Sequence, residues 1–137
     1  MWWTYALLSA LFAALTAVFA KVGIKGVSAD LATAIRTVVI LVVAWGIVLY
    51  KEQWRGFHLL TRQNIVFLIL SGIATGLSWI FYFKALSLGK VSQVAPVDKL
   101  SVALAIVLSI IFLGETPDWK TLAGAGLIIA GTFVLIL

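Results

Sequence analysis

Charged side chains inside apolar runs are the residues of this sequence best suited to chemistry. Arg36 stands in one such run, and the neighbours Asp98 and Lys99 stand in another. Each charge costs about 2.5–3.5 kcal/mol near the centre of a bilayer, so it needs an opposite charge, water or a ligand. Adjacent residues of a helix point about 100° apart, so only one of Asp98 and Lys99 can face Arg36 directly. We expect Arg36 and Asp98 to form a pair.

This pairing leaves Lys99 as a surplus cation, which can snorkel to the interface, accept an anionic group or reach a partner protomer. The charges could be an ion pair that joins two helices, a substrate or proton site, or interfacial residues without a function. Hydroxyl groups near these charges could bind the same ligand, although threonines often bond back to their own helix. They belong to Thr33, Thr37 and Ser101.

Aromatic residues at helical spacing lie near the end of a third apolar run. Tyr82 and Phe83 follow Trp79 at three and four residues, and Lys84 comes next. Such rings could form one wall of a site for an organic substrate. They could equally anchor the end of a helix at the membrane interface.

The composition indicates a membrane protein. Of the 137 residues, 64% are hydrophobic and 11% are charged, whereas about a quarter of the residues in soluble domains are charged. The net charge of +5 comes from Lys and Arg that mostly flank apolar runs, where lipid headgroups can bind them, so we expect no nucleic-acid partner. With no Cys and His58 as the only His, the chain lacks residues for a metal site or a catalytic triad. We predict no enzyme activity and no cofactor.

The apolar runs predict five transmembrane helices, since hydrocarbon about 30 Å thick needs roughly 20 apolar residues per helix. The predicted fold is an all-α integral membrane bundle in a single domain, because a β-barrel would show alternating segments. No basic residue precedes the first run, so we expect a retained helix and not a cleaved signal peptide. The predicted spans are about 2–20, 31–50, 65–83, 94–113 and 119–137.

Capping residues mark the expected helix ends. Asp30, Ser92 and Thr116 are placed to cap the second, fourth and fifth helices, and Gly114 to end the fourth. Pro96 lies near the start of the fourth helix. There it either costs little in the first turn, or it breaks the helix and frees carbonyl groups toward a cavity.

Small residues predict where helices approach one another closely, because lipid supplies no hydrophobic drive between helices. These contacts could lie within one protomer or, on the last helix, between two copies. The residues that we predict to pack helices are Gly72, Gly76, Gly124, Gly126 and Gly131.

The basic residues near the span ends do not indicate, under the positive-inside rule, which side of the protein faces the cytoplasm. Either other features determine the topology, or the protein inserts both ways and pairs head to tail with itself. Inverted repeats around a site near the midplane are common in transporters. Four basic residues flank each side, namely Lys51, Arg55, Arg62 and Lys120 on one and Lys21, Lys25, Lys84 and Lys90 on the other.

Several motifs resemble the EamA repeat of the drug/metabolite transporter superfamily. They are Phe81–Leu86, Val94–Val97, Leu113–Pro117 and Gly124–Gly131, with Arg36 similar to the arginine of that repeat's second helix. Most members carry two such repeats in opposite orientations and move amino acids, metabolites or drugs by alternating access. This sequence holds one repeat and is similar to the five-helix bacterial/archaeal branch. The resemblance implies a structural role for Glu115 at the end of the fourth helix.

We therefore expect a secondary transporter subunit in the cell inner membrane. It would move a small organic solute, such as a metabolite, an amino acid or a drug-like molecule, by alternating access as an antiparallel homodimer. The spans contain two basic residues, Arg36 and Lys99, and one acidic residue, Asp98. This excess of positive charge favours an anionic or zwitterionic solute. The alternative is a non-transporting subunit or scaffold that assembles with another membrane protein.

Overall fold

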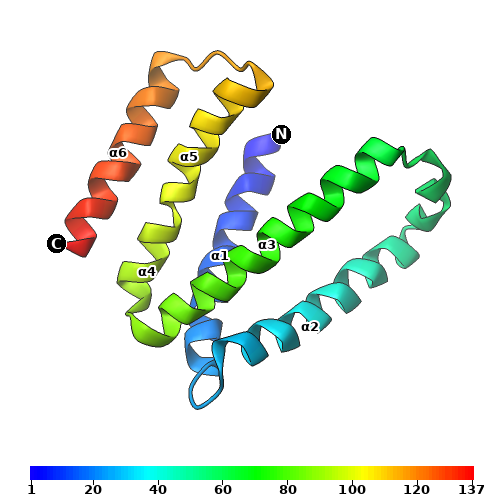
Figure 1. Ribbon diagram of the computed structural model, residues 1–137, viewed down its shortest axis with the longest axis horizontal. Coiled ribbons are helices and arrows are strands. Elements are labelled where there is room, and N and C mark those ends of the chain that lie inside the picture. The colour runs from blue at the N-terminus through cyan, green and yellow to red at the C-terminus, as the bar shows by residue number, and fades with distance from the viewer. The chain divides into compact units, whose positions relative to one another are not determined.

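The computed structural model of the protein, which describes residues 1–137, consists of helices joined by short connections and has no strands. Five helices are long and apolar enough to cross a membrane, which confirms the predicted all-α integral membrane fold. The elements in chain order (Figure 1) are α1 (Trp2–Gly23), α2 (Ala29–Tyr50), the 3₁₀-helix η1 (Gln53–Leu59), α3 (Arg62–Leu88), α4 (Val91–Asp98), α5 (Leu100–Leu108), the π-helix η2 (Ser109–Leu113) and α6 (Trp119–Ile136).

Helix α3 is longer than the predicted third span, which stops at Phe83. It continues through Lys84 to Leu88, because no glycine or proline interrupts the chain before Gly89. A lysine marks the membrane interface, whereas the end of a helix needs a residue that breaks it. The aromatic residues of the predicted substrate wall therefore lie inside a continuous helix and not at its end.

All three predicted N-caps are wrong, and for α2 and α6 a nearby side chain caps the helix instead. Ser28, not Asp30, caps α2, and its hydroxyl accepts a hydrogen bond from the N–H of Leu31 at 3.3 Å. Asp118, not Thr116, caps α6, and its carboxylate accepts from a first-turn N–H at 2.8 Å. A cap residue needs extended backbone, as at Ser28 and Asp118, whereas Asp30 already lies in the first turn of α2.

The fourth span is interrupted in its middle. Helix α4 ends at Asp98, Lys99 has a turn conformation, and α5 follows it. Pro96 has no N–H to donate to the carbonyl of Ser92, which removes one helical hydrogen bond just before the interruption. Of the two outcomes expected for this proline, the structure has a short break at Lys99, whose φ of −71° and ψ of −9° stay in the right-handed helical region. The Pro96 carbonyl accepts the Lys99 N–H at 3.0 Å, so carbonyl groups freed toward a cavity stay a prediction. Ser92 lies within α4 and is not the cap that we predicted.

The far end of the fourth span is wound as the π-helix η2. The chain leaves it through Gly114, whose φ of 67° is a left-handed conformation that glycine adopts without strain. The N–H of Glu115 then bonds to the carbonyl of Ser109 at 3.3 Å. The predicted end of the fourth helix at Gly114 is confirmed.

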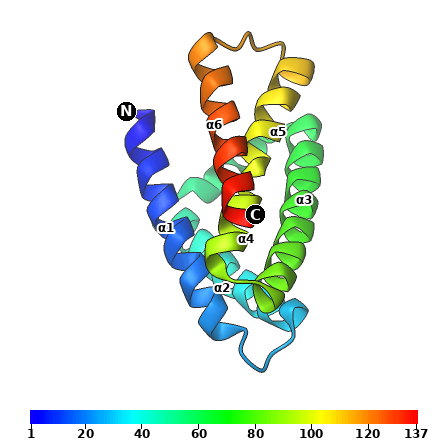
Figure 2. The same ribbon diagram turned by 90° about the vertical axis from the view of Figure 1, so that its left-hand side faces the viewer.

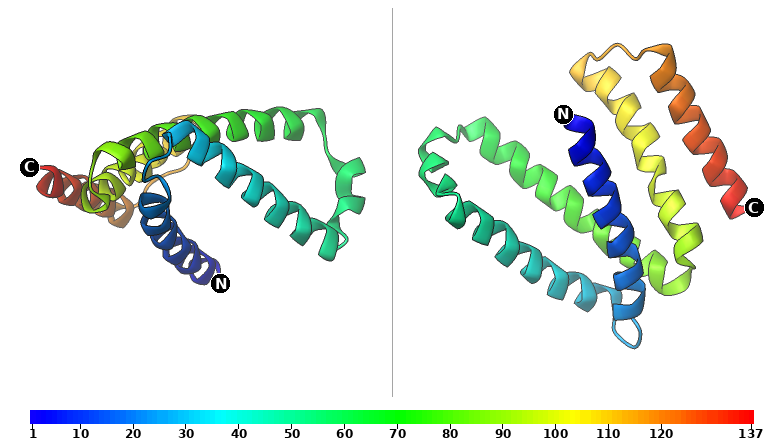
Figure 3. Two further views of the ribbon diagram at one scale, coloured as in Figure 1. Left: turned by 90° about the horizontal axis from the view of Figure 1, so that it is seen from below. Right: turned by 180° about the vertical axis from the view of Figure 1, so that it is seen from behind.

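Backbone contacts divide the chain into two compact units. Unit 1 contains Met1–Val18 and Leu88–Leu137, and unit 2 contains Phe19–Ser87. In unit 1, α6 runs antiparallel alongside α4 and α5 (Figure 1, Figure 2). In unit 2, α2 and α3 form an antiparallel hairpin closed by η1 (Figure 3). Each unit holds part of the predicted site.

The core of unit 2 lies where the end of α1, the start of α2 and the end of α3 contribute buried side chains. The Nζ of Lys21 donates a hydrogen bond to the carbonyl of Leu86, in the last turn of α3, where carbonyl groups lack helical donors. This contact and the buried side chains hold the end of α3 in place. The buried residues are Ala20, Ile24, Thr33, Phe83 and Leu86.

Candidate functional site

Arg36 of α2 lies against aromatic rings of α3. Its guanidinium carbon, Cζ, is 5.1 Å from the ring centroid of Trp79 and 4.6 Å from that of Phe83. Cation–π contacts contribute about 0.5–2 kcal/mol each, and they stabilise the charge without accepting strong hydrogen bonds. The rings therefore hold the guanidinium inside the span and leave its N–H groups available for an acceptor.

The spacing of the rings on α3 explains this arrangement. Trp79 and Phe83 are four residues apart and so share one face of the helix. Phe83 is fully buried and anchors the rings in the core, whereas Trp79 is half-buried. Tyr82 meets Phe83 edge to face, with centroids 6.0 Å apart and planes at 84°. The sequence analysis placed Phe83 beside Trp79 and Tyr82 in the aromatic group but selected only Trp79 and Tyr82 as binding residues, although the four-residue spacing of Phe83 from Trp79 is the signal for its contact with Arg36.

The threonines on either side of Arg36 use their hydroxyl protons within α2. Thr33 donates to the carbonyl of Ala29 at 2.8 Å, and Thr37 donates to the carbonyl of Thr33 at 2.8 Å. Thr33 is buried, but Thr37 is exposed. In this arrangement neither hydroxyl donates to a ligand, and the Thr37 oxygen can still accept a hydrogen bond.

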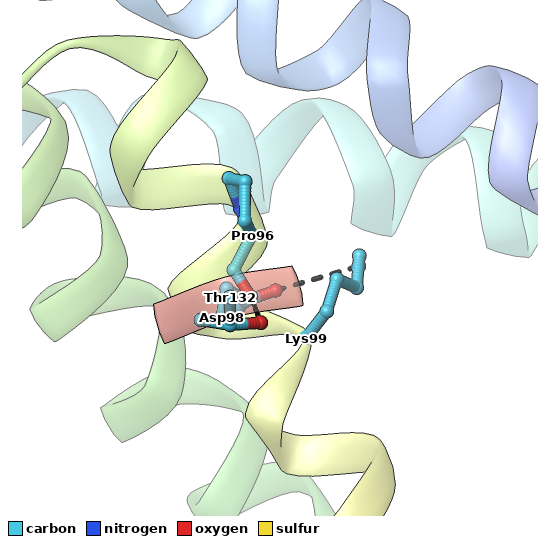
Figure 4. Close-up of polar contacts among 4 residues, drawn as sticks. All are labelled: Pro96, Asp98, Lys99 and Thr132. Carbon is cyan, nitrogen blue, oxygen red and sulfur yellow. Dashed lines mark hydrogen bonds and ion pairs between the residues drawn. The ribbon is translucent and has the colours of Figure 1, made fainter. Parts of the chain in front are cut away.

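Asp98 and Lys99 form an ion pair with each other at the interruption of the fourth span (Figure 4). The Nζ of Lys99 is 3.4 Å from the Oδ2 of Asp98. Adjacent residues of a helix point about 100° apart, and the long Lys99 side chain can still reach back to the carboxylate. That only one of the two can face Arg36 directly stays a prediction. Both side chains are partly exposed, at 56% for Lys99 and 37% for Asp98, so the pair is accessible to water or a ligand.

Thr132 of α6 contacts the backbone of α4 next to this ion pair. Its hydroxyl lies 3.2 Å from the carbonyl of Pro96 (Figure 4). It also lies 2.8 Å from the carbonyl of Ile128 in its own helix. Thr132 is only 3% exposed, so the contact is protected from water. The sequence analysis did not select this residue, and its signal is a lone hydroxyl in the apolar end of the last span.

The predicted pair between Arg36 and Asp98 joins residues of different units. It stays a prediction, although each residue has another partner within its own unit. Ser101 lies exposed on α5, two residues beyond Lys99. The predicted binding residues thus fall into two groups, one around Arg36 in unit 2 and one around the ion pair in unit 1.

The glycines that we predicted to pack helices face open space. A Cβ atom added at any of them would meet no atom within 4 Å outside the local helix. The close approach of helices that their spacing predicts stays a prediction, and a second copy of the chain is one surface that could make it. These glycines are Gly72, Gly76, Gly124, Gly126 and Gly131.

A small cavity of about 130 Å³ lies in unit 1 where η2 turns toward α6. The backbone hydrogen bond from Glu115 to Ser109 crosses the same turn. Glu115 follows the end of η2, and its structural role at this helix end stays a prediction. The lining residues are Ile106, Ser109, Ile110, Glu115, Thr116, Pro117 and Thr121.

Five apolar helices with ionic residues in the second and fourth spans define a multi-pass membrane protein. The chain belongs to the EamA-like transporter family, and the sequence model of that family matches residues 1–137. It is 48% identical over 134 residues to a protein of Sinorhizobium sp named "Uncharacterized transporter in cobO 3'region", covering 98% of this chain and 95% of that one. The protein is therefore a membrane transporter.

A second relative is an uncharacterized protein of Methanocaldococcus jannaschii. It is 33% identical over 78 residues, which cover 56% of this chain and 57% of the relative. No solved structure matches the chain.

Proposed function

We propose that the protein is a secondary transporter subunit that moves a small anionic or zwitterionic organic solute across the cell inner membrane by alternating access. The observation that carries this proposal is the interrupted fourth span, with the Asp98–Lys99 pair at the interruption. Transporters commonly place their substrate and ion sites at discontinuous helices. Non-helical backbone at membrane depth is tolerated where protein or a water-filled cavity surrounds it.

The working unit that we propose is an antiparallel homodimer. The matched part of the Sinorhizobium relative is 95% of its length, so that relative is also about one five-helix repeat long. Alternating access uses two repeats that rock against each other around a central site, and many transporters hold these repeats in inverted orientation. The equal numbers of basic residues on the two sides of the spans are consistent with insertion in both orientations.

The electrostatics of the spans favour an anion over a cation as solute. Asp98 and Lys99 neutralise each other at the interruption, whereas Arg36 is held by uncharged rings. A cationic solute would meet an uncompensated positive charge in a medium of low polarity. An anionic or zwitterionic solute could instead give Arg36 a partner.

Asp98 is our candidate for carrying a coupled proton. Its carboxylate is partly exposed at the interruption and has Lys99 as its ionic partner. Protonation would remove the negative charge and release the Lys99 ammonium. A cycle that alternates between paired and released Lys99 would couple proton movement to the exposure of the site.

The direct test is solute flux through liposomes that contain only this chain. Liposomes loaded with a mixture of amino acids and organic acids are separated from the medium, and mass spectrometry measures which solutes leave. Loss of selected anionic or zwitterionic solutes, absent from protein-free liposomes, is the expected result. No flux from the chain alone, together with flux after a second membrane protein is added, would favour the scaffold alternative.

A further inference from the structure

We propose that the Arg36 site recognises an organic monocarboxylate, with the carboxylate on the guanidinium and the carbon skeleton against Trp79. This inference rests on the proposed transport function, and it narrows the solute to one chemical class. It concerns residues of unit 2 alone, where Arg36 and both rings are placed relative to one another.

The ring contacts do not use the N–H donors of Arg36, so a ligand can accept hydrogen bonds from them. A guanidinium has five N–H donors in a rigid, planar fork that matches the two oxygens of a carboxylate. Trp79 and Phe83 contact the cation through its charge, at 5.1 and 4.6 Å from their centroids, and supply no oxygen acceptor. Thr33 and Thr37 donate their hydroxyl protons to carbonyls of their own helix, and a hydroxyl oxygen that can still accept is uncharged. An anionic acceptor that matches the fork with two oxygens must come from outside this cluster.

The number of charges favours a monoanion. Within its unit Arg36 contributes one positive charge at the rings, and one carboxylate neutralises it. A dicarboxylate would bring an additional negative charge into an aromatic site, which is unfavourable where water is scarce. An amine without a carboxylate would place two cations together. A ligand with one carboxylate therefore balances the single positive charge of Arg36.

The aromatic rings favour an organic body on that carboxylate. Trp79 is half-buried, so part of its ring is accessible next to the guanidinium, whereas Phe83 is fully buried and acts as the support. Stacking on an aromatic face is favourable for flat or apolar groups. An inorganic anion would bind the guanidinium of Arg36 but would leave the accessible part of the Trp79 ring uncovered.

Binding of a matched series of small aromatic probes tests the proposal on the full-length chain in a zwitterionic detergent. The probes are benzoate, the dicarboxylate phthalate, benzylammonium and benzyl alcohol, and the readouts are isothermal titration calorimetry and the melting temperature. We expect benzoate to bind and to raise the melting temperature, since a ligand of the folded state stabilises it. We expect the other probes to bind at least about tenfold more weakly. Benzylammonium and benzyl alcohol lack the charge-assisted interaction of a carboxylate, and phthalate brings a second, unpaired negative charge.

Variants assign the binding to the site. Arg36→Lys keeps the charge but loses the fork, so we expect benzoate affinity to fall about tenfold or more while the protein still folds. Trp79→Leu should weaken benzoate binding several-fold. Arg62→Gln, at the start of α3, is the matched control and should bind as the wild type does.

Each outcome separates this inference from the proposed transport function. Equal binding of benzoate by wild type and Arg36→Lys, or displacement of benzoate by anionic lipid with no probe selectivity, would overturn the carboxylate site. Flux of some other solute in the liposome assay would then leave the transport function standing. Benzoate binding that depends on Arg36, in a protein without flux, would support the site and contradict the transport proposal.

Discussion

The Thr132 hydroxyl of α6 lies 3.2 Å from the Pro96 carbonyl of α4, and it connects the last helix to the interrupted one. The hydroxyl has a single proton, which it shares with the carbonyl of Ile128 at 2.8 Å. When it donates to Pro96, α6 holds the backbone just before the interruption. When it donates to Ile128, that restraint is released. The carbonyls of Pro96 and Ile128 therefore compete for one proton.

Thr132→Val should loosen the interrupted span. Valine has the same shape but no hydroxyl, and the loss of a buried hydrogen bond destabilises a protein by about 1 kcal/mol. We expect that decrease in the free energy of unfolding, measured in mixed micelles with a denaturant. Thr121→Val on the exposed side of α6 is the control and should change stability little. Equal stability of both variants would mean that the Pro96 contact does not restrain the span.

Pro96→Ala should stabilise the fourth span and slow transport. Alanine supplies the N–H that proline lacks, so the carbonyl of Ser92 can regain its helical hydrogen bond. Because proline inside a helix costs up to about 3 kcal/mol relative to alanine, we expect a gain of about 1–3 kcal/mol in the free energy of unfolding. Liposome flux should fall if the interruption is needed for alternating access. Pro117→Ala, in the loop before α6, serves as the control. Wild-type flux in a stabilised Pro96→Ala protein would show that the interruption is not part of the mechanism.

Asp98→Asn should abolish solute flux while the protein still inserts. The amide cannot carry a proton at neutral pH, and it removes the negative partner of Lys99. Flux is measured in liposomes with and without a proton gradient, and insertion by resistance to carbonate extraction. Asp30→Asn in the first turn of α2 is the matched control. Wild-type uptake by Asp98→Asn would remove Asp98 from the mechanism.

The Asp98→Asn/Lys99→Met double variant separates charge imbalance from loss of function. Removing one member of an ion pair leaves the other unpaired, which is more destabilising than removing both. We therefore expect the double variant to be more stable than Asp98→Asn and still inactive. Recovery of flux in the double variant would indicate that only the unpaired Lys99, and not the missing proton carrier, had blocked transport.

A single cysteine at the end of α6 should react from both sides of the membrane. The chain has no native Cys, so Leu137→Cys carries the only thiol. For an antiparallel dimer, about half of the thiols in intact cells should react with a membrane-impermeant maleimide, and the rest should react after lysis. Labelling of all thiols or of none before lysis would show a single orientation and would exclude the antiparallel arrangement.

The positions of the spans could be predicted because they depend on local composition. Each apolar run is long enough for the hydrocarbon layer, and the helices occur where the runs are. Helix ends were harder to predict, since Asp30 and Ser28 are both good caps by type and only the backbone conformation at Ser28 selects between them. The interruption near Pro96 was one of two expected outcomes, because the cost of a proline depends on how many helical turns precede it.

The candidate site was only partly predictable. Sequence alone selected Arg36 because a charge in an apolar run requires a partner, and it selected Trp79 because of its helical spacing. It could not select Phe83 over Tyr82, since both adjoin the same helix face and the packing of α2 against α3 decides which ring the guanidinium meets. It also missed Thr132, whose contact with Pro96 joins residues 36 positions apart.

The sequence by itself determined the class of this protein, five apolar helices with Arg36, Asp98 and Lys99 inside the second and fourth, because burial in lipid is decided by the composition of each segment. Only the tertiary structure decided the partners, Arg36 with Trp79 and Phe83, and Asp98 with Lys99. Partners depend on the rotation of each helix about its axis and on where a helix breaks. Both are set by contacts between segments that are distant in the chain or by a local turn, and hydropathy records neither.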